Sequence, residues 1–348
     1  MAELTREEWL ALSNPAVPEK MLLAPPVPMW PQDCHAWRAR ADRLDEVPEL
    51  ADCAPMGTKV TDNDRRLLYS AHMRTVRTPA IRKGIPVTAE PIKANRQRIG
   101  GKIAIVIEGP RGTGKSTLLD AIAVYWHRRL SRLYGPDENR IPVVALTVPP
   151  PGRGNVRNWA GAFARFLGQE REGGDPTASV IHTMRNARTL LVVVDSIERL
   201  RTRTEIEQAF QYLDVISEET GATFVYCGRN AHPIVDPQTR DNDTPLEQDE
   251  TPWGDSVVLR TSRIGYSDEE MASFVSIVDL FDADLRLFRH ERGDLTALAP
   301  YLHRRSRGYM RTLSHLICQA AQGAIVSGEE RITEELLKKV SLGQTVQL

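Results

Sequence analysis

The sequence predicts an α/β fold with a parallel central sheet, followed by a small all-helical domain. Two observations lead to this prediction. Between residues 103 and 260, short apolar runs alternate with longer helical patterns, as in proteins whose helices cover both faces of a parallel sheet. After Gly265 the strand patterns stop and capped helical patterns follow. We therefore place the α/β core at 61–264 and the helical domain at 265–348, behind a proline-rich arm at 1–60.

The N-terminal arm has eight prolines, with Trp9, Trp30 and Trp37 between them. This composition is typical of an extended segment that docks through aromatic anchors, with one short helix near residues 35–44. The alternative is a partly ordered leader without a role of its own.

Residues 64–102 form a basic segment that starts with a helix at 64–76. Thr78-Pro79 begins a new element, because proline disfavours helical geometry in the residue before it. Only Asp64 and Glu90 oppose its ten basic residues, which are Arg65, Arg66, Arg74, Arg77, Arg82, Lys83, Lys93, Arg96, Arg98 and Lys102. The net charge of the whole chain is only −1, with 45 basic and 46 acidic residues. That balance is a compensated sum, so it does not exclude a nucleic-acid partner.

The core is expected to contain five strands with helices between them. The expected strands are 103–107, 141–148, 190–194, 223–227 and 256–260, and the expected helices are 115–133, 155–167, 176–186 and 204–219. Residues 233–255 form a long acidic loop of a length typical of functional or disordered segments. In the C-terminal domain, helical patterns begin at 267 and continue near 282–290, 295–305, 308–327 and 333–340.

An unbroken match to the phosphate-binding loop GxxxxGK[ST] follows the first expected strand. It consists of Gly109, Pro110, Arg111, Gly112, Thr113, Gly114, Lys115 and Ser116, with Thr117 directly behind it. The glycines let successive backbone N–H groups point at phosphate oxygens, at the positive end of the following helix. Lys115 is expected to reach the β- and γ-phosphates of ATP, and Ser116 to ligate Mg²⁺. The alternative is a glycine-rich turn that binds no nucleotide.

Two carboxylates are candidates for the chemistry. Asp195 ends the third apolar strand, where such sites hold Mg²⁺ through water; the alternative is a helix cap. Ser196 follows it, so Glu198 is the nearest acid that could activate a water, provided the chain turns tightly after the strand. Glu198 is equally a candidate for a surface ion pair with Arg199 or Arg201.

Further along the chain, Asn230 and Arg229 follow the fourth strand, where a polar residue often contacts the γ-phosphate. Arg311 begins a long helix from which it could reach back to the nucleotide, or it is simply a solvated helix arginine.

With these residues in this order, the chain resembles AAA+ ATPases, and more specifically the TniB/TnsC-type transposition ATPases found beside transposase genes in actinobacteria. The resemblance covers about residues 64–345. It rests on RTPAIRK at 77–83, IPVVALTVPP at 141–150, FARFL at 163–167, ATFVY at 222–226, LRLFRH at 285–290, YLHRR at 301–305 and LSHLI at 313–317. It implies ATP-dependent assembly of a homo-oligomeric ring or filament on double-stranded DNA, with recruitment of a transposase and a TniQ-like targeting protein. It also implies an arginine that acts in trans on the neighbouring subunit's nucleotide.

The chain departs from that family at two positions. Ser196 stands where the family usually has the Glu of an Asp-Glu pair. The family tends to carry Arg-Phe before the fifth strand, where this chain has WGDS at 253–256, so Arg240, Arg260 or Arg263 would have to substitute. We expect ATP binding, with hydrolysis slow or lost.

The loop after the second strand lines the pore in ring-forming AAA+ proteins, which nominates Arg153 and Arg157 for DNA contacts. The alternative is a solvated face or pairing at a subunit interface. Two other functions stay open: a STAND-type signalling or defence NTPase, and a nucleotide-binding scaffold that bridges partners without turnover. The acidic N-terminus, the lack of an 18-residue apolar run and four dispersed cysteines predict a cytoplasmic protein without a membrane contact.

Overall fold

The computed structural model describes residues 30–43, 47–58, 60, 64–71, 73–152, 157–169, 175–236 and 256–342. These residues form two compact units. The α/β unit contains 28–43 and 79–262, and the helical unit contains 44–78 and the residues from 263 onward. Each unit is described by itself.

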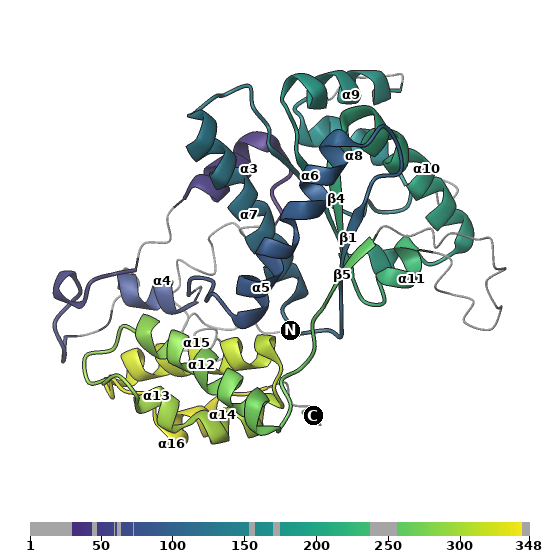
Figure 1. Cartoon of the computed structure of the whole chain (residues 1–348). Helices are drawn as coiled ribbons and strands as arrows, with labels where there is room; N and C mark the ends of the chain where they lie inside the picture. The colour runs from purple at the N-terminus through teal and green to yellow at the C-terminus, as the bar shows by residue number, and fades with distance from the viewer. Residues whose placement is uncertain are drawn as a thin grey trace, which may run out of the picture. The chain divides into compact units, whose positions relative to one another are not determined.

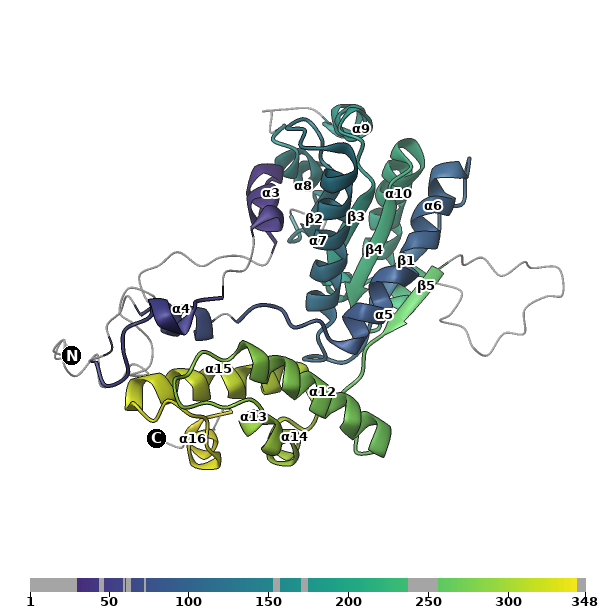
Figure 2. The same cartoon turned by 60° about the vertical axis from the view of Figure 1, so that its left-hand side comes forward.

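The α/β unit is built on a five-stranded parallel sheet in the order β2-β3-β4-β1-β5; Figure 1 labels β4, β1 and β5, and Figure 2 labels all of these strands. The strands are β1 (Ala104–Glu108), β2 (Val143–Thr147), β3 (Leu191–Asp195), β4 (Thr223–Gly228) and β5 (Ser256–Arg260). All five predicted strands are confirmed, and each boundary shifts by two residues at most. Every residue of β3 and β4 is buried, which explains why these segments are almost wholly apolar.

Helices cover both faces of this sheet, with α7 on one face and α10 on the other (Figure 2). The helices of the unit are α3 (Cys34–Asp42), α5 (Pro79–Val87), α6 (Ala89–Gln97), α7 (Lys115–Tyr134), α8 (Trp159–Phe166), α9 (Thr177–Asn186), α10 (Arg203–Thr220) and α11 (His232–Val235), with a 3-10 turn, η3 (Ile197–Arg199). Thr202 and Glu205 form a reciprocal capping box that starts α10 one residue before its predicted start. The short helix predicted in the N-terminal arm is confirmed as α3.

The helical unit contains α4 (Arg65–Ala71), α12 (Asp268–Asp284), α13 (Asp294–Ala297), α14 (Ala299–Ser306), α15 (Met310–Ser327) and α16 (Glu334–Lys339), with a 3-10 turn, η1 (Leu50–Asp52). The helix predicted at 282–290 is wrong. α12 runs on to Asp284, and the backbone is extended at Leu285. The Asp282 carboxylate then accepts the N–H groups of Gly293 and Leu295 at the start of α13. α4 also ends earlier than predicted, at Ala71.

The first part of the basic segment, residues 64–78, belongs to the helical unit. The sequence instead predicts that the whole segment belongs to the α/β core, which it starts at residue 61. Leu67 and Val76 are buried in the apolar core that α12 to α16 form. The Arg66 guanidinium, buried in the same unit, bonds both Asp64 and Glu330. Among the described residues, no helix is both long and apolar enough to cross a membrane.

Candidate nucleotide-binding site

The phosphate loop lies between β1 and α7, as predicted. Gly109, Gly112 and Gly114 have φ angles of 149°, 83° and 93°, a region that residues with a side chain disfavour. A Cβ atom at Gly109 would stand 2.1 Å from the carbonyl oxygen of Thr261, so only glycine lets the loop approach the end of β5 this closely. Because α7 starts at Lys115 directly behind the loop, its free N–H groups favour an anion there.

Side chains of the loop already hold it in a closed turn. The Lys115 Nζ donates to the Pro110 carbonyl oxygen over 2.7 Å. The Thr113 Oγ1 donates to the same oxygen over 2.9 Å and lies 2.7 Å from the Thr261 Oγ1. Burial lowers the pKa of Lys115, against the opposite effect of nearby acidic groups such as Asp195. A lysine beside the free N–H groups at the start of α7 fits the phosphates of a nucleotide.

The carboxylate predicted to hold magnesium lies beside this loop. The Ser116 Oγ lies 3.3 Å from the Asp195 Oδ1, which also accepts the Ser196 N–H over 2.8 Å. In the sheet Asp195 is paired with Cys227, and burial, followed by the charge of Asp195, raises the pKa of that thiol well above its ordinary value. A serine hydroxyl next to a carboxylate at the head of a phosphate loop is the donor set that Mg²⁺ uses in such sites, so the residues fit the metal.

One contact of this carboxylate was not expected. The Trp30 Nε1 donates to the Asp195 Oδ2 over 3.0 Å, across 165 positions of sequence. The sequence marks Trp30 only as one of three tryptophans in the proline-rich arm, and nothing in its local pattern points to Asp195.

Glu198 reaches the end of β4 because the chain turns tightly after β3. Ser196 adopts a left-handed conformation, with φ 64° and ψ 40°, and η3 follows it. The Glu198 Oε2 accepts the Arg229 N–H over 3.3 Å, and its Oε1 lies 3.9 Å from the Arg229 Nε. Gly228 leaves room for this approach, since a Cβ there would stand 2.4 Å from the Glu198 Oε2. The turn that water activation requires is present, and the catalytic role of Glu198 stays a prediction.

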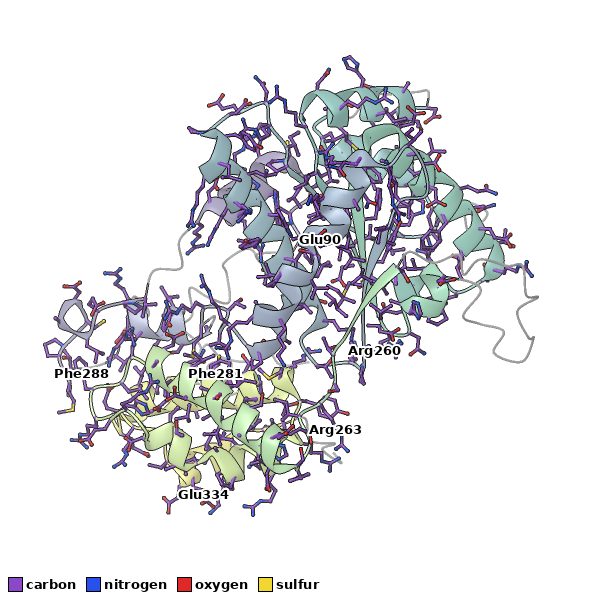
Figure 3. All side chains as sticks on the ribbon, in the orientation of Figure 1. Glu90, Arg260, Arg263, Phe281, Phe288 and Glu334 are labelled. Carbon is purple, nitrogen blue, oxygen red and sulfur yellow. The ribbon has the colours of Figure 1, made fainter. Side chains whose placement is uncertain are left out.

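A pocket of about 810 Å³ lies between the start of the phosphate loop and the residues that follow β4; Gly109, Pro110, Glu198 and Asn230 are among the residues that line it. Asn230 is exposed and left-handed, with φ 48°. At the rim, the Arg260 Nε donates to a Glu108 carboxylate oxygen over 2.8 Å; Figure 3 labels Arg260 on β5. The location of Asn230 in this pocket agrees with a contact to the γ-phosphate, which stays a prediction.

Three further predicted nucleotide contacts have different surroundings. Arg111 is exposed in the loop, and Thr117 is half-buried in the first turn of α7. Arg311 is exposed in the first turn of α15, in the helical unit. Contacts of all three with nucleotide stay predictions.

The two arginines predicted to contact DNA cannot be treated alike. Arg153 lies outside the described residues. The Arg157 side chain is only 8% exposed, and its guanidinium donates to the carbonyl oxygens of Pro149 and Arg199 and to the Glu205 carboxylate. In this arrangement Arg157 fastens the segment after β2 to the start of α10. A phosphate contact by Arg157 stays a prediction, and it would require these bonds to break.

The basic segment also divides into residues with internal partners and residues facing solvent. Internal hydrogen bonds or ion pairs involve Arg66, Arg74, Arg96, Arg98 and Lys102. Four other basic residues are exposed and form no such bond with another described residue: Arg77, Arg82, Lys83 and Lys93. The second group is the part of the segment that is accessible to a polyanion.

The parallel sheet, the phosphate loop and the carboxylate at the end of β3 define an AAA+ P-loop NTPase fold. In agreement, residues 98–232 match the family model described as AAA domain. That segment includes the phosphate loop, Asp195 and Asn230.

Solved structures give the same fold. The chain is similar to the Aeropyrum pernix ORC1 protein, solved in complex with DNA, with 16% identity, coverage of 78% of this chain and 67% of that one, and a TM-score of 0.50. It is similar to the Aeropyrum pernix ORC2 protein, solved as ADPNP-ADP complexes, with 15% identity, coverage of 80% and 71%, and a TM-score of 0.50. A search of curated protein sequences returns no match.

Proposed function

We propose that this protein binds ATP with Mg²⁺ and uses the bound nucleotide to control its assembly on double-stranded DNA, as a regulator of transposition. The observation that supports nucleotide binding best is the phosphate loop closed by Lys115, with the Ser116 hydroxyl 3.3 Å from the Asp195 carboxylate. Lys115, the loop N–H groups and Ser116 would hold the phosphates and the metal. Mg²⁺ would neutralise phosphate charge there.

Binding of a fluorescent ATP analogue tests the first part. Lys115→Ala removes the phosphate lysine and should weaken binding by at least about tenfold, since a hydrogen bond between charged groups is lost. Lys93→Ala is the matched control, because Lys93 is an exposed lysine of the same unit. Equal affinity in the wild type and both variants would contradict the proposal.

DNA is proposed as the partner on two grounds. The Aeropyrum pernix ORC1 protein, which has the same fold, was solved in complex with DNA. In addition, Arg82, Lys83 and Lys93 are exposed basic residues of the α/β unit. Binding through phosphates predicts little sequence preference and an affinity that falls steeply with salt.

Electron microscopy tests the assembly. The protein, linear duplex DNA and a non-hydrolysable ATP analogue should together give rings or filaments, and omitting nucleotide should abolish them. Monodisperse monomers under every nucleotide condition would contradict assembly.

The role in transposition rests on the TniB/TnsC-type sequence patterns. It predicts nucleotide-dependent capture of a transposase and a TniQ-like protein encoded beside the gene. Failure of purified neighbouring transposase to bind the DNA-assembled protein would remove this part while leaving the ATP and DNA parts intact.

A second candidate function is a nucleotide-binding scaffold that no longer hydrolyses ATP. It is favoured by Ser196, which follows Asp195 where an acid is usual, and by the proximity of Glu198 to the Arg229 guanidinium. Phosphate release, measured with and without DNA and with Lys115→Ala as the blank, separates the two. Release at the level of the blank supports the scaffold.

A further inference from the structure

The N-terminal strap, which we define as residues 30–43, is fastened along α7. In both views α3 lies beside α7 (Figures 1 and 2). The Arg40 guanidinium pairs with the Asp120 carboxylate at 2.5 Å, and the Arg128 Nε donates to the Ala41 carbonyl oxygen over 2.6 Å. Because α7 is the helix that follows the phosphate loop, the strap and the loop share one rigid support.

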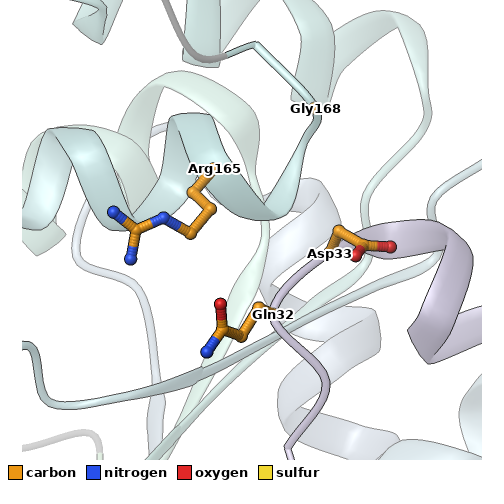
Figure 4. A pocket seen from close by; sticks show the side chains of 4 residues that line it. All are labelled: Gln32, Asp33, Arg165 and Gly168. Atoms are coloured by element: carbon orange, nitrogen blue, oxygen red, sulfur yellow. The ribbon is translucent and has the colours of Figure 1, made fainter.

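Stacking fixes the start of the strap. The Trp37 ring is almost fully buried, at 1% exposure, and the Trp30 ring stacks on it with 6.3 Å between centroids and 21° between planes. Between them, Asp33 caps α3 by accepting the Ala36 N–H; Asp33 also lines a pocket beside Arg165 at the end of α8 (Figure 4). The Trp30 indole is therefore held in place by packing rather than by its hydrogen bond alone.

The bonds of Asp195 show what this indole does. Its Oδ1 accepts from the Ser196 N–H and is within reach of the Ser116 hydroxyl, while its Oδ2 accepts from the Trp30 N–H. A hydroxyl rotates freely, so Ser116 can turn from the carboxylate to a metal ion. The backbone N–H and the indole N–H cannot turn, and together they fix the plane of the carboxylate.

We propose that Trp30 is a positioning residue of the magnesium site, and that the strap is a structural part of the nucleotide site. This inference rests on the proposed ATP and Mg²⁺ binding. Trp30 acts through Asp195: its N–H holds one carboxylate oxygen so that the other faces Ser116. Without this hydrogen bond the Asp195 carboxylate could rotate, and binding the metal would have to immobilise it. That loss of freedom would lower the affinity for Mg²⁺.

The test measures binding and not turnover. Trp30→Phe keeps an aromatic ring for stacking on Trp37 and removes the N–H. Trp126→Phe is the matched control, because the Trp126 Nε1 donates to the Thr88 Oγ1 over 2.8 Å, a contact that involves no residue of the proposed site. Affinity for a fluorescent ATP analogue is measured in EDTA and then across a Mg²⁺ titration, using the full chain.

Trp30→Phe should need about tenfold more Mg²⁺ to reach half of the metal-dependent increase in affinity, since a hydrogen bond to a charged group is lost. Its affinity in EDTA should equal that of the wild type, and Trp126→Phe should be unchanged in both measurements. An unchanged Mg²⁺ midpoint in Trp30→Phe overturns the inference. A lower midpoint also overturns it, since the indole would then be competing with the metal.

Melting temperatures without nucleotide check that the variants fold. If Trp30→Phe does not fold, Trp30→Leu replaces it, since leucine also lacks the N–H donor. A wild-type protein without nucleotide affinity would instead refute the proposed function itself.

Discussion

Arg66 provides the sharpest test of how the basic segment is used. Its side chain is 3% exposed, and it bonds the carboxylates of Asp64 and Glu330, which are 3% and 4% exposed. Arg66→Met keeps much of the volume and leaves two buried negative charges without their cation. Removing one partner of a buried ion pair costs about 3–5 kcal/mol. Asp64 keeps the N–H of residue 66 and Glu330 keeps that of Phe288, so we expect the lower end, about 3 kcal/mol.

Urea unfolding, followed by circular dichroism, measures this loss. Arg77→Met is the matched control, because Arg77 is an exposed arginine of the same unit; it should change the free energy of unfolding by no more than about 0.5 kcal/mol. Adding Glu330→Gln to Arg66→Met should recover part of the loss by removing one of the two charges. If Arg66→Met were no less stable than Arg77→Met, Arg66 would not be a structural cation.

Three other changes give distinct results. Glu198→Gln should lower phosphate release at least about tenfold with ATP affinity unchanged; equal release would assign the water to another group. Arg82→Glu with Lys83→Glu should weaken DNA binding and reduce the slope of affinity against salt, measured by fluorescence anisotropy, whereas an unchanged slope would move the contact elsewhere. Burial lowers the pKa of His127 below its ordinary value of 6.5, so the unfolded chain takes up more protons as the pH falls through that value. The free energy of unfolding should therefore decrease from pH 7.5 to 5.5, and His127 accounts for at most about 1.4 kcal/mol of this per pH unit. In urea titrations, His127→Leu should show a weaker pH dependence than the wild type. An identical pH dependence in the variant would contradict this role of His127.

The sequence was sufficient for the features that depend on local pattern. The five strands follow from apolar runs, and the phosphate loop follows from the spacing of its glycines and Lys115. Asp195 follows from its location at the end of a buried strand. Each of these depends on neighbours a few positions away, so a single segment contains the whole signal.

Contacts between distant segments could not be predicted in this way. Trp30 and Asp195 are 165 positions apart, and Arg66 and Glu330 are 264 apart. In the sequence Arg66 resembles Arg82, yet one is buried between two carboxylates and the other faces solvent. Burial of a charge depends on which partners the fold supplies, and composition does not reveal them.

The left-handed Ser196 affects how this site can change by mutation. A glutamate at position 196 would adopt a conformation that costs residues with a Cβ atom about 1–2 kcal/mol, a cost that Ser196 itself already bears. The same turn brings Glu198 to the end of β4, so straightening the backbone to suit a new acid would withdraw the existing one. A substitution at position 196 therefore keeps Glu198 in place only if it keeps this left-handed turn, which glycine, asparagine and aspartate tolerate best.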